Sequence, residues 1–155
     1  MIRILLLLAL LITNSVKAQA LDEKAAVKAA VDTFFDGFHK GDTTTMRTVL
    51  NSEVKLFTVF KNKASEDELV TGTVEDMLKG IAQKPAGQKW DERLLDYDIK
   101  IDGSMANVWT PYEFYYNDAF LHCGVNSFQL FKENDKWKIV FIMDTRRLTG
   151  CDNHQ

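Results

Sequence analysis

Apolar positions recur at helical spacing in three stretches of the N-terminal half of the chain. Between residues 22 and 40 they form one stripe, and Gly41 follows as a helix-end signal. A short second helix is predicted over residues 43–50, and a third over residues 73–83, where a capping box stands at its start. These segments predict amphipathic helices, each with one face to bury.

The period changes to two in the rest of the chain. Residues 53–60 alternate between apolar and polar positions, which predicts a strand. Four antiparallel strands joined by short turns are predicted near residues 90–101, 104–116, 119–131 and 137–147. Helices followed by a long meander predict an α+β domain. We expect the helices to pack on a curved, mostly antiparallel sheet and to leave a cone with a pocket at its open end.

The first twenty residues have the three parts of a cleavable signal peptide. Arg3 supplies the positive charge, residues 4–12 are an unbroken apolar run, and Ala18-Gln19-Ala20 supplies the small residues before the cut. The run is about half of the roughly 20 residues that cross a bilayer, so a membrane anchor is not expected. We predict residues 1–20 as a signal peptide and residues 21–155 as a single domain. The exported protein would occupy the periplasm or the extracellular space, with no membrane span after cleavage.

Charge and cysteine content narrow the function classes. Loss of Arg3 and Lys17 leaves 17 basic and 22 acidic side chains, a formal charge of −5, which argues against a nucleic-acid partner. No metal-ligand spacing and no phosphate or dinucleotide motif is present, so neither a metal site nor a cofactor is predicted. The two cysteines, Cys123 and Cys151, favour a disulfide in an exported protein; a reactive thiol is the alternative.

Two-residue turns at 117–118 and 134–135 would sort the strand side chains onto two faces. One face then carries Asp144 and Arg146 near Tyr97 and Tyr112. This group would bind an acidic ligand or act as general acid and base; a structural ion pair is the alternative. A slip of one residue at any turn would move a strand's side chains to the opposite face.

The other face would place Glu113 directly opposite His122. A carboxylate that orients an imidazole forms an acid–base pair, with Asn126 as a nearby hydrogen-bond donor; a structural cross-strand pair is the alternative. Trp109 lies on this face as well. The many aromatic side chains of these strands predict mainly core, with some left for a pocket that stacks a flat ligand or for a dimer interface on the sheet face.

Three segments resemble the nuclear transport factor 2-like (NTF2-like, or cystatin-like) superfamily, in its SnoaL-like and "putative lumazine-binding" branches. They are residues 34–42, 112–132 and 137–147, and the resemblance extends from about Lys24 to Cys151. It implies a cone-shaped pocket for a small, apolar molecule. The acid–base motif of the ketosteroid isomerase-like members has no full counterpart in this sequence, which speaks against that activity.

Three functions remain open at this point. The first is an exported binding protein for a small hydrophobic or aromatic molecule. The second is a cofactor-independent isomerase or lyase that uses His122 with Glu113, or Asp144 with Tyr97. Ligand-binding roles would then fall to Tyr112, Trp109, Asn126 and Arg146. The third is a non-catalytic module that forms a homodimer through its sheet face.

Overall fold

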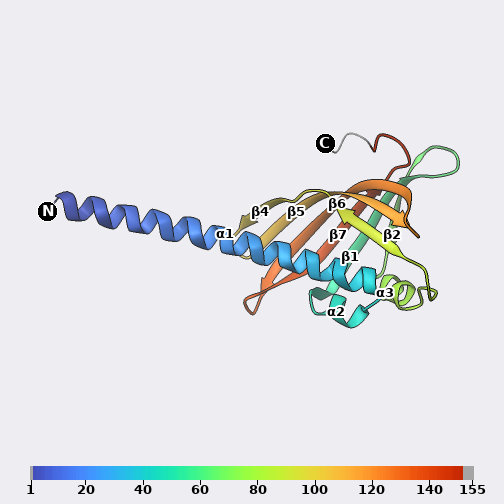
Figure 1. Cartoon of the computed structure of the whole chain (residues 1–155), viewed down its shortest axis with the longest axis horizontal. Coiled ribbons are helices and arrows are strands. Elements are labelled where there is room, and N and C mark those ends of the chain that lie inside the picture. Colours follow the sequence, from blue (N-terminus) through green and yellow to red (C-terminus); the bar gives the residue numbers. More distant parts are fainter. Residues whose placement is uncertain (1, 152–155) are drawn as a thin grey trace.

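The computed structural model describes residues 2–151, and side chains from Leu21 onward. Figure 1 shows a long helix lying across one face of a strongly curved sheet, with two shorter helices at one end. The described helices are α1 (Ile2–Lys40), α2 (Thr43–Arg47) and α3 (Val74–Ala82). The described strands are β1 (Leu50–Lys61), β2 (Asp67–Gly72), β3 (Trp90–Leu94), β4 (Asp98–Asp102), β5 (Met105–Tyr116), β6 (Ala119–Glu133) and β7 (Lys136–Arg146). The predicted α+β cone is confirmed.

The strands of the described chain form one seven-stranded sheet in the order β2-β1-β7-β6-β5-β3, and β4 also pairs with β5. Every pairing is antiparallel except that of β1 with β7, which is parallel. The parallel pair joins the first strand to the last and sets them between the edge strand β2 and β6. The concave side of this sheet faces α1 and builds the site.

Three predicted boundaries differ from the structure. The strand expected over 90–101 is two strands, β3 and β4, which pair with different parts of β5. The helix expected over 43–50 ends at Arg47, because Leu50 already pairs with Ile139 at the start of β1. The helix expected from residue 22 continues N-terminally to Ile2 as part of α1.

The core forms between the apolar stripe of α1 and the concave side of the sheet. Phe34 and Phe35 both meet Phe128 of β6 edge-to-face, at centroid distances of 6.0 Å. Burial of each such ring contributes roughly 1.5–3 kcal/mol. The stripe predicted from sequence therefore anchors α1 to the sheet.

The N-terminal part of α1 extends beyond the sheet (Figure 1). The side chains of the predicted leader, including its cleavage site at Ala18-Gln19-Ala20, lie outside the described residues. Among the residues that the structure describes, no helix combines the length and the apolar character needed to cross a membrane.

Two β-bulges decide which side chains of β6 and β7 face the concave side. The turn at Asn117-Asp118 pairs Tyr115 with Phe120, but the register then shifts and His122 pairs with Phe114. A second shift follows between Gln129 and Leu130. Because each shift moves one strand by one residue, side chains change faces relative to a regular hairpin.

Candidate functional site

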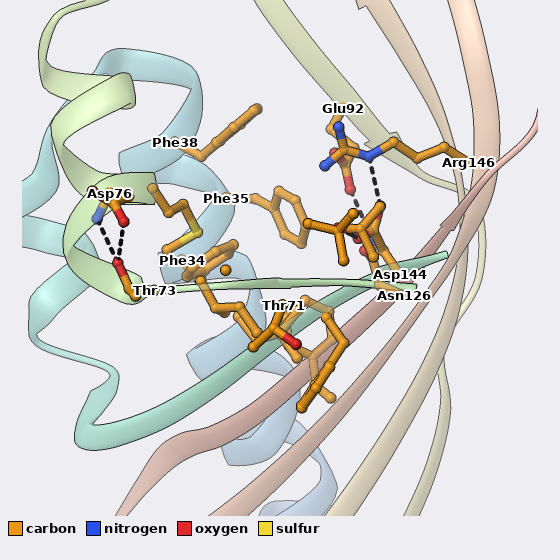
Figure 2. A pocket seen from close by; sticks show the side chains of 18 residues that line it. Phe34, Phe35, Phe38, Thr71, Thr73, Asp76, Glu92, Asn126, Asp144 and Arg146 are labelled. Atoms are coloured by element: carbon orange, nitrogen blue, oxygen red, sulfur yellow. Dashed lines mark hydrogen bonds and ion pairs between the residues drawn. The ribbon is translucent and has the colours of Figure 1, made fainter. Parts of the chain in front are cut away.

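A hollow of about 410 Å³ opens between α1, α3 and the concave side of the sheet (Figure 2). Its apolar lining comes from Phe34, Phe35 and Phe38 of α1, with Met77 of α3. We call it the inner cavity. An adjoining hollow of about 460 Å³ shares Phe38 and Met77 with it. Cavities of this size accept a small organic molecule.

A polar cluster forms one wall of the inner cavity, where β7 and β6 pass each other. Asp144 accepts hydrogen bonds from Thr58 Oγ1 at 2.5 Å, from Arg146 Nε at 2.9 Å and from the Tyr112 hydroxyl at 3.3 Å. The Tyr112 hydroxyl also lies 2.9 Å from the carbonyl oxygen of Thr145. Burial is the main cause that raises the pKa of Tyr112, so the phenol stays protonated.

Gly124 makes room for that tyrosine. It pairs with Tyr112 across β5 and β6, and a Cβ atom there would lie 2.8 Å from Tyr112 Cε1 and 1.7 Å from the Thr145 carbonyl oxygen. Real side chains do not tolerate such distances. Glycine at this position therefore lets the phenol cross β6 and reach the backbone of β7.

Glu92 of β3 is the second carboxyl group of the cluster. Asn126 donates a hydrogen bond from Nδ2 to its Oε1 at 2.7 Å. Loss of solvation raises the pKa of Glu92 to about 7; the neighbouring charge of Asp144 adds to this effect, whereas Asn126 and Arg146 oppose it. Near neutral pH this group can therefore give or take a proton.

His39 of α1 holds the backbone of Glu92 in place. His39 Nε2 lies 3.0 Å from both the amide nitrogen and the carbonyl oxygen of Glu92. Burial lowers the pKa of His39, in agreement with a neutral ring. The contact ties β3 to α1 beside the inner cavity.

His122 lies between the adjoining hollow and the mouth of the cone. Its ring stacks on Phe114 at a centroid distance of 4.9 Å, and its Nδ1 lies 3.5 Å from the Tyr112 hydroxyl. Desolvation first, and then the charge of Arg146, lower the pKa of His122 to about 4. The imidazole is therefore neutral at physiological pH and can act as a hydrogen-bonding group.

Five of the residues predicted for the site come together on the concave side: Tyr112, His122, Asn126, Asp144 and Arg146. The sequence placed Tyr112, Asp144 and Arg146 on one face, which the structure confirms. It placed His122 and Asn126 on the opposite face, which is wrong. The bulges between β5 and β6 and between β6 and β7 bring all five to the same side.

The other three predicted residues lie elsewhere. Glu113 pairs with Cys123, not with His122, because of the first bulge, and it accepts a hydrogen bond from Tyr115 at 2.8 Å. The predicted Asp144–Tyr97 pair is also wrong. Tyr97 lies in the break between β3 and β4, and its hydroxyl donates to Asp32 of α1 at 2.5 Å. Trp109 is half-exposed on the convex side of the sheet.

Glu92 is the residue that sequence reasoning missed. The signal was present: in the run Trp90 to Leu94 the alternate positions are Trp90, Glu92 and Leu94, so a carboxylate interrupts an otherwise apolar face. A buried acid in such a row is costly unless it has a partner or a task. Because the strand predicted over residues 90–101 is in fact two strands, β3 and β4, the sequence did not show which face of the sheet Trp90, Glu92 and Leu94 occupy.

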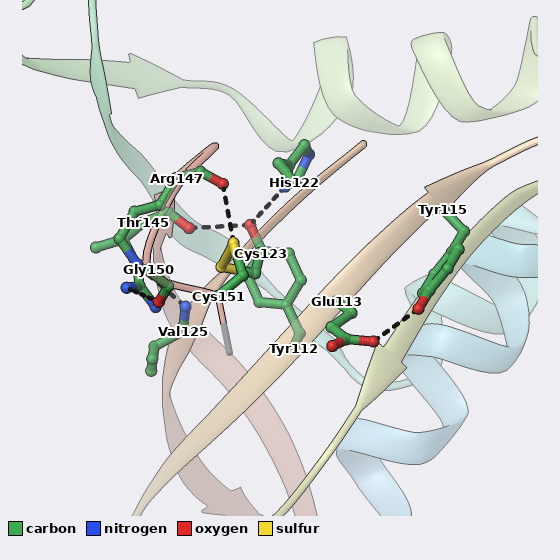
Figure 3. Close-up of a disulfide and its surroundings, with 10 residues drawn as sticks. All are labelled: Tyr112, Glu113, Tyr115, His122, Cys123, Val125, Thr145, Arg147, Gly150 and Cys151. Carbon is green, nitrogen blue, oxygen red and sulfur yellow. Dashed lines mark hydrogen bonds between the residues drawn. A yellow bond between two sulfur atoms is a disulfide. The ribbon is translucent and has the colours of Figure 1, made fainter. Parts of the chain in front are cut away.

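The predicted disulfide between Cys123 and Cys151 is formed, with the two Cα atoms 5.7 Å apart (Figure 3). Cys123 also exchanges both backbone hydrogen bonds with Arg147, at 3.0 and 2.8 Å. The covalent bond thus fastens the end of the described chain to β6, one residue from His122. Neither cysteine is a free thiol, which removes the reactive-thiol alternative.

Among the described residues, no group of three or more His, Cys, Asp or Glu side chains is arranged to hold a metal ion. The polar side chains of the described site include the carboxyl groups of Glu92, Asp144 and Asp76, one guanidinium, a neutral imidazole, a phenol and an amide. The site can bind a polar edge of a ligand and can move a proton.

A family model described as "Putative lumazine-binding" matches residues 22–143. The chain belongs to this family. The match covers the whole of the sheet except the end of β7, and it includes Glu92, Asn126 and residues 22–40 of α1. No curated protein matches the chain.

Many solved structures share the fold. An NTF2-like protein of unknown function from Shewanella baltica is 18% identical, with a TM-score of 0.61, over 83% of this chain and 97% of that one. An NTF2-like protein from Cytophaga hutchinsonii is 13% identical, with a TM-score of 0.63, over 80% and 98%. A "Putative Scytalone Dehydratase" from Novosphingobium aromaticivorans is 13% identical, with a TM-score of 0.65, over 85% and 89%. At these identities the likeness establishes the NTF2-like fold alone.

Proposed function

We propose that the protein binds a small hydrophobic or aromatic molecule in the inner cavity. The observation that carries this proposal is the pairing of an aromatic lining from α1 with polar groups gathered on one wall. A flat ligand would pack against Phe34, Phe35 and Phe38 and present its polar edge to Asn126 and Asp144. The family description names lumazine, a flat heteroaromatic molecule, which agrees with this shape.

A thermal-shift screen tests the proposal with lumazine, riboflavin and a steroid as probes. A ligand that binds the folded state raises the melting temperature in proportion to the logarithm of its concentration. The Met77→Trp variant would fill the cavity and should abolish the shift, because Met77 lines both adjoining hollows. Met105→Trp on the convex side is the matched control. A shift that survives Met77→Trp would place the ligand outside this cavity.

A second candidate function is acid–base catalysis without a cofactor, and the position of Glu92 favours it. A carboxyl group with a pKa of about 7 beside a hydrogen-bonded carboxylate, Asp144, suits proton transfer to and from a bound ligand. His122 would act as a neutral hydrogen-bonding partner. Glu113 and Tyr97 lie away from the cavity and have no part in this proposal.

The catalytic candidate is tested with any compound that the screen identifies. Wild-type protein in deuterated buffer should exchange an acidic C–H of that compound, and Glu92→Gln should lose at least tenfold in rate while still binding. Equal rates in the two proteins would leave a binding protein without proton-transfer activity.

We also propose that the protein is exported after cleavage behind Ala20. The leader pattern of residues 1–20 and the disulfide support this location, since disulfides persist in oxidising compartments. The intact mass of protein recovered from the periplasm or the medium tests it: the expected chain begins at Leu21. A chain that retains Met1 in the cytoplasm would contradict the proposal.

The convex side of the sheet is the proposed surface for a homodimer. Met105, Trp109 and Phe131 are apolar and exposed there, and Met105 pairs directly with Phe131. Light scattering should give twice the mass of the chain, and Trp109→Glu should reduce it to the monomer. A monomeric wild type at high concentration would exclude the dimer.

A further inference from the structure

We propose that the mouth of the cone, at Arg146, is an anion subsite, and that the ligand is therefore a small organic acid with an apolar ring. This inference rests on the proposed binding function and specifies its ligand class. The ring would occupy the inner cavity, and the acid group would stay at the rim on the guanidinium of Arg146.

Arg146 lies where the hollows of the site meet. It lines the inner cavity, the adjoining hollow and a third hollow of about 730 Å³ at the mouth. Its Nε donates to Asp144 at 2.9 Å. Among the described residues, no hydrogen bond engages its two terminal nitrogens, and its side chain is half-exposed. The terminal edge of a guanidinium carries N–H groups in the geometry that grips a carboxylate with two hydrogen bonds.

The third hollow, which we call the rim hollow, has a positive lining. Lys61, Arg146 and Arg147 contribute to it, together with the hydroxyls of Thr58 and Thr149, and no Asp or Glu of the described residues lines it. Lys61 also pairs with Asp67 at 2.9 Å, but both side chains are largely exposed, so this pair holds the ammonium weakly. In a chain with a net charge of −3, such a lining selects anions locally.

The acidic groups of the site lie deeper than the basic ones. Glu92 and Asp144 line the inner cavity, whereas the rim hollow contains neither. The guanidinium of Arg146 lies near Glu92 (Figure 2), and the charge of Arg146 acts to lower the pKa of Glu92. An acid group pushed into the inner cavity would approach Glu92 and Asp144, whereas at the rim it would meet Arg146 together with Lys61 and Arg147. This order fixes one orientation for the ligand, with its ring inside and its acid group at the rim.

A pair of fluorescent probes separates the two parts of the proposal. 8-Anilinonaphthalene-1-sulfonate and N-phenyl-1-naphthylamine share the same rings, but only the first carries an acid group. Arg146→Met should lower the affinity for the sulfonate probe about tenfold, because it removes a charge-assisted contact. It should change the affinity for the neutral probe by less than about twofold, because the apolar cavity remains. Arg146→Gln, which keeps an N–H donor for Asp144, should give the same selective loss if Arg146→Met folds poorly.

The chain offers a matched control in Arg93. It pairs with an aspartate two residues before it, as Arg146 does, but on the convex side. Arg93→Met should change the affinity of both probes by less than about twofold. Lys61→Met should lower the affinity for the sulfonate probe about threefold. Lys100→Met breaks a similarly exposed Lys–Asp pair and should leave that affinity unchanged.

The outcomes distinguish a failed subsite from a failed cavity. Suppose that both probes bind the wild type and that Met77→Trp abolishes the binding of both. If the Arg146 variants then change the affinity for the two probes equally, the anion subsite is wrong, but the inner cavity is still the binding site. If neither probe binds in a way that Met77→Trp abolishes, the proposed binding function falls, and the anion subsite falls with it.

Discussion

Two strands of the sheet carry the same short pattern, an aspartate followed two residues later by an arginine. On β3 the Asp91–Arg93 pair faces the convex side with an N–O distance of 3.0 Å, and on β7 the Asp144–Arg146 pair faces the cavity at 2.9 Å. The two arginine side chains are similarly exposed, at 47% and 53%, but Asp91 is 22% exposed and Asp144 only 13%.

The surroundings of the two pairs differ more than their geometry. Arg93 lies 3.8 Å from the centre of the Tyr115 ring, and its Nε donates to Asp91 at 3.0 Å. Asp144 also accepts hydrogen bonds from Thr58 and Tyr112 and lies close enough to Glu92 to raise the pKa of that carboxyl. The Asp91–Arg93 pair is therefore an isolated ion pair on the convex side of the sheet, whereas the Asp144–Arg146 pair is part of the hydrogen-bonded cluster that lines the cavity.

The largest expected effect comes from the disulfide that fastens the chain next to the inner pair. The double variant Cys123→Ala and Cys151→Ala should lose about 3.5 kcal/mol of unfolding free energy, as expected for a cross-link spanning 28 residues. NMR signals of His122 and Arg146 should change, whereas those of Arg93 and Tyr115 should not. Reduced wild type should behave like the variant; a loss below about 1 kcal/mol would mean that the backbone bonds of Cys123 and Arg147 suffice.

The two aspartates provide the direct comparison. Asp144→Ala should cost about 2–3 kcal/mol, because it removes three hydrogen bonds to a largely buried carboxylate. Asp91→Ala should cost less than about 1 kcal/mol, as expected for an exposed pair. Urea unfolding of both variants measures the difference. Equal losses would show that burial on the concave side does not strengthen the inner pair.

The pH dependence of stability should come from the concave side, where two groups act in opposite directions. The pKa of Glu92 is raised from 4.5 to about 7, so the folded state holds its proton longer and this group's contribution is lost as the pH rises from 4.5 to 7. The pKa of His122 is lowered from 6.5 to about 4, so its contribution is lost as the pH falls from 6.5 to 4.

Single variants should separate these two effects. Relative to wild type, Glu92→Gln should gain about 1–2 kcal/mol of stability as the pH is raised from 4.5 to 7, and His122→Gln should gain a similar amount as the pH is lowered from 6.5 to 4. Unfolding curves recorded across pH 4–8 check both signs.

The fold was largely predictable from the chain. Helical spacing over residues 22–40 and alternation after Trp90 arise from local burial of one face, and a single sequence records that pattern directly. The capping box at Thr73 is equally local: the Thr73 side chain accepts from the Asp76 amide at 3.1 Å, as predicted. The pairing of the two cysteines was predictable as well, because the leader pattern of residues 1–20 favoured a disulfide.

The site was predictable only in part. Residue type and spacing singled out Asp144, Arg146 and Tyr112, and the turn at 117–118 formed where its sequence indicated. The bulges after Tyr115 and before Leu130 have no comparable local signature, and each moves a strand by one residue. The acid–base pairs expected from a regular register therefore do not exist, and Glu92 takes their place.

The sequence by itself determined the helices, most of the strands and the apolar stripe of α1, because those depend on neighbours along the chain; it missed β2 and the break between β3 and β4. The pairing of Cys123 with Cys151 was predictable because the chain has two cysteines. Tertiary structure alone decided that Glu92, Asn126, His122 and Asp144 share one side of the sheet. Side-chain direction in a strand reverses with every residue, so a single-residue shift set by the packing of the curved sheet is enough to move a group from the convex surface into the cavity.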